Sequence, residues 1–180
     1  MYIKIDDVII DEVERTKLLG VIINSTLTWQ DHIKSVCSKV SKNICILYKV
    51  KNNVKSDVLV TLYHTLIEPY LQYCNIVWAS QNNIHLQKLF VKQKKAVRIL
   101  TNEKWDAHAQ PIFYELNLMT IVSINRFQTY CFMYKVSRGL VPTFFLNWFV
   151  EKTNLYMTII KDNQHTFTLR SIEQLPERST

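Results

Sequence analysis

Apolar side chains recur every three or four residues along most of this chain, which is the period of an amphipathic α-helix. The spacing predicts helices at about 28–51, 56–78, 84–100 and 120–138, and Pro111 favours a short helix over 111–116. Before residue 25 the pattern alternates instead, so two short paired strands are predicted, at 2–10 and 18–23. The predicted fold class is mainly α, with a small antiparallel β-hairpin at the N-terminus followed by a bundle of about five helices.

Particular residues mark the ends of these helices. Thr28, with Asp31 three residues later, predicts a capping box at the start of the first helix. Ser56 is the predicted N-cap of the second helix, and Pro69 should kink or break that helix because proline removes a backbone hydrogen bond. The segment 70–78 is too apolar for an exposed position, so it is predicted to lie in the hydrophobic centre.

The formal net charge of +7 is concentrated in the middle of the chain. Residues 34–104 hold twelve basic and three acidic residues, a net charge of +9, whereas 1–33 carry −3 and 105–180 carry +1. The first and third long helices each have an apolar face and a cationic face. The predicted apolar face of the first helix comprises Ile33, Val36, Cys37, Val40, Ile44, Leu47 and Tyr48. The cationic faces either contact a nucleic-acid backbone or are simply solvated. The candidate phosphate contacts are Lys34, Lys39, Lys42, Lys88, Lys92, Lys94, Lys95 and Arg98.

The composition excludes or disfavours several kinds of site. Two glycines in 180 residues exclude the glycine-rich loops that hold nucleotide phosphates. One of them, Gly139, is the predicted C-terminal cap of the helix at 120–138. The cysteines show no CxxC spacing and the histidines no HExxH motif, so free, buried thiols in an intracellular protein are predicted. Apolar runs are far shorter than the roughly 20 residues of a membrane span. We therefore expect no cofactor, no metal and no membrane partner.

Asp6 and Asp7 are the most conspicuous candidates for chemistry, because adjacent carboxylates hold Mg²⁺ in nucleic-acid polymerases. Position 4 is a lysine where such polymerases usually carry an aromatic residue, and no third carboxylate precedes the pair. The pair is therefore predicted to form a hairpin turn. His32 is predicted to be structural. The tryptophans are predicted to be core or anchor residues, since stacking on bases would require them to lie exposed beside the lysines.

A series of short motifs stands in the order of one known family. It begins with Leu18-Leu19-Gly20-Val21 and residues 27–33, and it continues through residues 62–78. Further on come Gln93-Lys94-Lys95-Ala96 with Arg98, His108, Pro111, residues 132–135 and Pro142. Over roughly residues 13–150 the chain thus resembles the reverse transcriptases of jockey-like non-LTR retrotransposons. It departs from them at Leu18, where the family often has Phe, and at Ala79, where it often has Gly.

The resemblance implies the C-terminal region of an RNA-directed DNA polymerase. Residues 1–25 would be a remnant palm hairpin, 26–104 a basic thumb-like domain, 105–150 a helical extension and 151–180 an irregular tail. The cationic helix faces would then track the RNA or DNA backbone of a template–primer.

The Tyr-x-Asp-Asp motif that binds metal in the family is missing from this sequence. The chain as given is therefore expected to be a truncated fragment without catalytic residues of its own, and Mg²⁺ is expected only in the full-length family enzyme. The absent palm or fingers are a second expected partner. The alternative is a protein-interaction module or a non-functional retrotransposon relic, with an aromatic cluster meeting a partner: Phe144, Phe145, Trp148 and Phe149.

Overall fold

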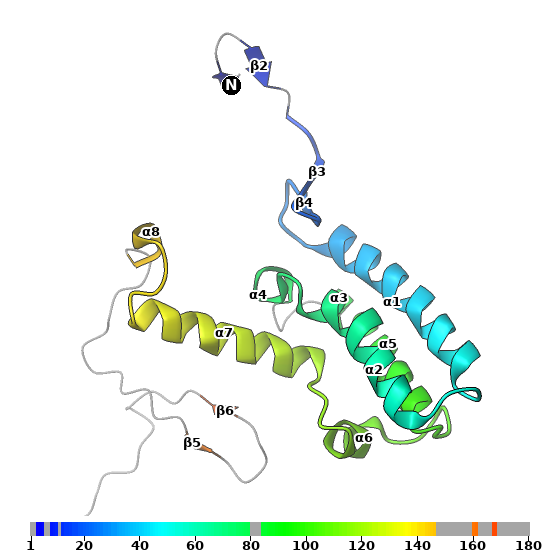
Figure 1. Cartoon of the computed structure of the whole chain (residues 1–180). Coiled ribbons are helices and arrows are strands. Elements are labelled where there is room, and N and C mark those ends of the chain that lie inside the picture. Colours follow the sequence, from blue (N-terminus) through cyan, green and yellow to red (C-terminus); the bar gives the residue numbers. More distant parts are fainter. Residues whose placement is uncertain are drawn as a thin grey trace, which may run out of the picture. The chain divides into compact units, whose positions relative to one another are not determined.

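The computed structural model describes residues 3–5, 8–10, 12–79, 84–146, 160–161 and 167–168 (Figure 1). The chain divides into two units between Phe132 and Met133, and each unit is described by itself. The described residues are mainly helical, with antiparallel strands at the N-terminus, which confirms the predicted fold class. The four-part division of the chain stays a prediction.

Two hairpins, rather than one, precede the helices. β1 (Ile3–Ile5) pairs with β2 (Val8–Ile10), and β3 (Arg15–Leu18) pairs with β4 (Val21–Asn24). The predicted strands at 2–10 and 18–23 were therefore wrong in their extent and pairing. Leu19 and Gly20 form a two-residue turn between β3 and β4, with φ of 46° and 87°. Positive φ at both positions is the backbone of a type I′ turn, which suits the twist of a hairpin.

Helix α1 (Gln30–Val50) starts without the predicted capping box. Its N-cap residue is Trp29, with a left-handed backbone at φ 59° and no capping hydrogen bond from its side chain. The Thr28 N–H donates to Asn24 Oδ1 at 3.0 Å, and Thr28 Oγ1 accepts from Asn24 Nδ2 at 2.7 Å. Because Asn24 holds Thr28 in the turn before the helix, the capping prediction was wrong. Asp31 instead forms an exposed ion pair with Lys34 at 4.0 Å.

The predicted second helix divides into three. α2 (Ser56–Leu66) ends before Pro69, as expected, and α3 (Glu68–Gln72) carries that proline in its first turn. A second break follows at Cys74, whose φ of 50° separates α3 from α4 (Asn75–Trp78). Short helices joined by such turns cannot keep one continuous apolar face toward the core.

Two further details of this region differ from expectation. The N-cap of α2 is Lys55, and Ser56 instead donates its hydroxyl hydrogen to the Leu100 carbonyl at 3.4 Å. Only part of 70–78 lies in the hydrophobic centre. Its buried members are Leu71, Asn75 and Trp78, and its exposed ones are Tyr70, Gln72, Tyr73, Ile76 and Val77.

The third long helix, α5 (Ile84–Leu100), has its predicted bounds. α6 (Ala109–Glu115) begins two residues earlier than expected, after the N-cap residue His108. α7 (Ile121–Ser137) follows Thr120, whose Oγ1 accepts a hydrogen bond from the Ser123 N–H at 3.1 Å. A hydroxyl at this position satisfies one of the free N–H groups at a helix start.

The second unit holds the end of α7, then α8 (Thr143–Leu146) and a strand pair, β5 (Ile160–Lys161) with β6 (Phe167–Thr168). Gly139, with φ 65°, follows α7 as the predicted cap, and its N–H bonds to the Val136 carbonyl at 3.0 Å. Phe144 and Phe145 stack with ring centroids 4.0 Å apart. Trp148 and Phe149, the other members of the predicted aromatic cluster, lie outside the described residues.

The core of the first unit forms where α1 packs against α2, α3 and α5 (Figure 1). The predicted apolar face of α1 is confirmed at five positions, whereas Cys37 is half-buried and Tyr48 is 62% exposed. On α7 the apolar residues at helical spacing are buried at Ile121 and Ile124 but exposed at Phe127. The buried residues of α1 that carry this packing are Ile33, Val36, Val40, Ile44 and Leu47.

Candidate nucleic-acid interface

Several of the candidate phosphate contacts lie where α1 packs against α5. Lys92 Nζ donates a hydrogen bond to Ser41 Oγ at 2.6 Å. Burial raises the pKa of the nearby Cys37 thiol, and the positive charges of Lys92 and Lys88 oppose that rise. Side chains of α1 and α5 therefore form one polar, positively charged strip along the line where the two helices pack together.

Two contacts give the relative direction of these helices. The Ser41–Lys92 bond and the 2.8 Å bond from Lys51 Nζ to Asn102 Oδ1 both join residues 51 positions apart, so α1 and α5 run parallel. Residues seven apart lie close to one line along a helix, because two turns take about seven residues. Lys34 therefore lies on the same line as Ser41. We define the α1–α5 seam as Lys34, Ser41, Lys88, Lys92 and Lys95.

Carboxylates are scarce beside this seam. Within residues 12–79 and 84–146, the ion pairs within 4.0 Å are Lys34 with Asp31 and His64 with Glu68. The three α5 lysines of the seam thus have no carboxylate within that distance in this part of the chain. Since like charges on one helix repel each other, a bound anion would relieve the repulsion.

The other predicted contacts on α5 are used within the protein. Lys94 Nζ lies 4.3 Å from the centroid of the Phe90 ring. Arg98 Nε donates to the Ala107 carbonyl at 2.7 Å and so holds the loop after α5. Lys42 is exposed on α1. The eight candidate residues therefore do not form one surface.

Lys39 lies beside a separate pocket of about 430 Å³, between the β3–β4 turn, α1 and α3. Its Nζ is 5.4 Å from the centroid of the Tyr70 ring. The hydroxyl of Tyr73 donates to the Leu19 carbonyl and closes one side of this region. The pocket is lined by Leu19, Gly20, His32, Val36, Lys39, Thr65, Pro69, Tyr70 and Tyr73.

His32 is a buried structural residue, as predicted. Its Nδ1 accepts a hydrogen bond from the Ile22 N–H at 3.3 Å, and its ring meets Trp78 edge-on at 5.3 Å between centroids. Burial is the larger of two causes that lower the pKa of His32 below its ordinary value, and the positive charge of Lys39 is the smaller. The neutral ring is the form that can accept the bond from β4.

Mild acid should destabilise the protein through His32. Because its folded pKa lies below the ordinary 6.5, the unfolded state binds more protons than the native state between these two values. The stabilisation is therefore complete above about pH 6.5 and is lost as the pH falls toward the folded pKa. Thermal unfolding from pH 7 to pH 5 should show a steeper fall for the natural chain than for His32→Gln. Equal slopes would contradict this assignment.

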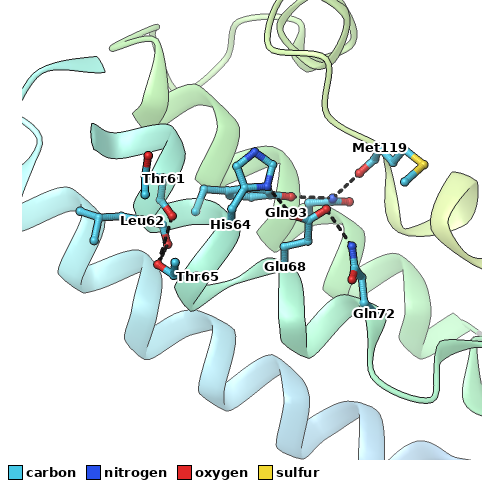
Figure 2. A network of polar contacts seen from close by, with 9 residues as sticks. Thr61, Leu62, His64, Thr65, Glu68, Gln72, Gln93 and Met119 are labelled. Carbon is cyan, nitrogen blue, oxygen red and sulfur yellow. Dashed lines mark hydrogen bonds and ion pairs between the residues drawn. The ribbon is translucent and has the colours of Figure 1, made fainter. Parts of the chain in front are cut away.

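Gln93 is a fully buried glutamine whose role the sequence analysis did not predict. Its Nε2 donates to Tyr63 Oη and to the Met119 carbonyl, each at 2.9 Å (Figure 2). Its Oε1 accepts from the Ile121 N–H at 2.8 Å. It thereby satisfies a free N–H at the start of α7. The signal was available, because Gln93 stands four residues after Leu89, within the apolar arc of α5.

A line of hydrogen-bonded polar side chains lies close by at the surface of α2 and α3. Glu68 pairs with His64 through one carboxylate oxygen and accepts from Gln72 Nε2 at 3.0 Å through the other (Figure 2). His64, Glu68 and Gln72 are four positions apart, so their side-chain contacts follow one side of the broken helix. They form a local brace across the break before Pro69.

The remaining sequence candidates have mixed outcomes. Trp78 is fully buried, as expected of a core residue, but Trp105 is 87% exposed. The cysteines are free, yet Cys45 is exposed and the other three are half-buried, so the prediction of buried thiols was wrong. Among the described residues, no three His, Cys, Asp or Glu side chains come together to hold a metal ion. Asp6 and Asp7 lie outside the described residues.

In the part of the chain that the structure describes, none of the helices combines the length and apolar character needed to cross a membrane.

Comparison with known proteins identifies two related polymerases. The chain is 24% identical over 121 residues to a probable RNA-directed DNA polymerase from transposon X-element of Drosophila melanogaster. The matched stretch covers 65% of this chain and 13% of that protein. The chain is 29% identical over 108 residues to the RNA-directed DNA polymerase from mobile element jockey of Drosophila funebris, covering 58% of this chain and 12% of that protein. No family model and no solved structure matches.

The chain therefore spans about an eighth of the length of these curated relatives. Both are polymerases of mobile elements, and one is the jockey enzyme itself, which confirms the resemblance seen in the motifs. Over about 60% of its length, the chain is similar to a segment of the RNA-directed DNA polymerases of jockey-like non-LTR retrotransposons.

Proposed function

We propose that this chain acts as a nucleic-acid-binding segment of a non-LTR retrotransposon reverse transcriptase. On this proposal its α1–α5 seam contacts the phosphate backbone of a template–primer, and the chain supplies no catalytic carboxylate of its own. RNA-directed DNA synthesis, with its Mg²⁺, would belong to the full-length parent enzyme.

One observation carries the proposal. Lys88, Lys92 and Lys95 lie within two turns of one helix, and within the described ranges none has a carboxylate within 4.0 Å. Lysine side chains that neutralise phosphates release condensed counterions, which favours binding without any sequence preference. Lys34 adds a fourth charge from α1, because its exposed pair with Asp31 at 4.0 Å is weak and easily exchanged.

The geometry also ranks the eight candidate contacts. The seam lysines, Lys34, Lys88, Lys92 and Lys95, are proposed as the principal phosphate contacts. Lys39 and Lys94 lie over aromatic rings and Arg98 holds a loop carbonyl, so these three are proposed to contribute less. Lys42 is exposed and contributes general positive charge.

Removing the seam charges should reduce both the affinity and its salt dependence. The triple variant Lys88→Ala/Lys92→Ala/Lys95→Ala removes three contacts, so the slope of log affinity against log salt on B-DNA should fall by about 2–3, at about 0.9 per phosphate. Fluorescence anisotropy with a labelled duplex at several salt concentrations measures this slope.

The matched control removes three exposed lysines outside the seam: Lys17→Ala/Lys55→Ala/Lys104→Ala. It lowers the net charge equally and should leave most of the slope intact. Equal effects of the two triple variants would show that the seam is not the contact surface. Failure of the natural chain to bind any duplex or single strand at low salt would overturn the proposed function itself.

The alternative, a protein-interaction module, rests on exposed apolar side chains around the β3–β4 turn and α3–α4. Leu19 is 82% exposed, Tyr73 51% and Val77 50%. Such a patch is suited to contact with another part of a polymerase, such as palm or fingers. Concentration-dependent self-association in sedimentation, relieved by Leu19→Ser/Val77→Ser, would support this candidate.

A further inference from the structure

Tyr48 lies on the line of the α1–α5 seam, two helical turns beyond Ser41. Its position, seven residues after Ser41 and fourteen after Lys34, places the three side chains along one side of α1. The ring is 62% exposed, although the spacing of apolar residues predicted it as part of the packed face. A large aromatic side chain therefore stands in solvent at the end of a row of cations.

Contacts from both helices hold this end of the seam in place. Lys51 Nζ lies 5.1 Å from the centroid of the Tyr48 ring, and the same ammonium donates to Asn102 Oδ1 at 2.8 Å. Asn102 itself follows α5 with a left-handed backbone, φ 56°. The tyrosine is thus positioned by a cation that is anchored just beyond the end of the neighbouring helix, and a preorganised ring loses little freedom on binding.

We infer that the seam takes an unpaired strand of nucleic acid, with its phosphates along Lys34, Lys88, Lys92 and Lys95 and one base stacked on Tyr48. This inference rests on the proposed function and specifies the form of nucleic acid that the site prefers. Stacking of a base on an aromatic ring is largely independent of sequence and requires a base whose face is accessible.

The dipoles of the two helices support this placement of the phosphates and the base. α1 and α5 are parallel, so both of their N-terminal, partly positive ends lie toward Lys34 and Lys88, where anionic phosphates are favoured. Both C-terminal ends lie toward Tyr48, where a neutral base costs no electrostatic energy. Ser41 and Tyr48 are about 10 Å apart along the helix axis, at 1.5 Å per residue.

The test compares a single-stranded oligothymidylate with a duplex DNA of the same length, using the full chain. Tyr48→Ala should weaken binding of the single strand by about 5- to 150-fold, the usual range for loss of one stacked base. Its salt slope should stay unchanged, since no phosphate contact is lost. Tyr48→Phe should keep the affinity because the ring remains, and duplex affinity should change less than twofold in either variant.

Tyr114→Ala is the matched control, because Tyr114 is also an exposed tyrosine, at 57%, and lies on α6 outside the seam. It should leave both affinities unchanged, and thermal unfolding should confirm that both alanine variants fold. Unchanged binding of the single strand by Tyr48→Ala, or equal losses for single strand and duplex, would overturn the inference. Salt-dependent duplex binding would then still leave the proposed function standing.

Discussion

Replacing Trp78 with alanine should lower the free energy of unfolding by about 3–5 kcal/mol, the usual cost of removing a large aromatic side chain from a core. Trp78 is fully buried in the described structure, its Nε1 donates to the Tyr73 carbonyl at 2.8 Å, and its ring contacts His32. The change would leave a cavity and an unpaired carbonyl at the same place. Urea denaturation followed by circular dichroism measures the loss.

The chain provides its own control for this prediction. Trp105→Ala removes a side chain of the same size that is 87% exposed, and it should change the free energy of unfolding by less than about 0.5 kcal/mol. If Trp78→Ala prevents folding altogether, Trp78→Phe keeps most of the volume and should still cost more than Trp105→Ala. Equal effects at the two positions would contradict the assignment of Trp78 to the core.

Replacing Gln93 with leucine should cost about 3–5 kcal/mol even though leucine is more apolar and nearly the same size. The change leaves three groups without their partner: the buried Tyr63 hydroxyl and Ile121 N–H, and the partly buried Met119 carbonyl. Each unsatisfied buried polar group costs about 1–3 kcal/mol. The start of α7 should also loosen, which hydrogen exchange at Ile121 would report.

Gln72→Leu is the corresponding control, because Gln72 is exposed and its side chain donates to the Glu68 carboxylate at the protein surface. Its cost should stay below about 1 kcal/mol, since water can replace the lost bond. A cost for Gln93→Leu no greater than that of Gln72→Leu would show that the buried network does not stabilise the fold.

Much of the fold could be predicted because helical periodicity is a local signal. The bounds of α5, the break before Pro69 and the cap at Gly139 follow from side-chain spacing and from the backbone preferences of two residue types. The structural role of His32 was also predicted correctly. These features depend on residues close together in the chain, so one sequence contains the information.

The errors arose where a distant or competing partner decides the outcome. Thr28 is a good capping residue, but Asn24 holds it in a turn. Ser56 is another, but its hydroxyl bonds to the Leu100 carbonyl. Tyr73 belongs to an apolar segment and yet is exposed, because it lies in the turn between the short helices α3 and α4. Tyr48 has the spacing of a core residue but is exposed near the end of α1.

The candidate site shows the same division. The sequence by itself determined that the positive charge lies in residues 34–104, on helices with one apolar face, and that the chain resembles a reverse-transcriptase segment. Only the tertiary structure decided that α1 and α5 run parallel, that Lys34, Lys88, Lys92 and Lys95 share a seam, and that Arg98 holds a loop instead. Charge is a property of each residue, whereas a surface depends on which helices pack together and in which direction.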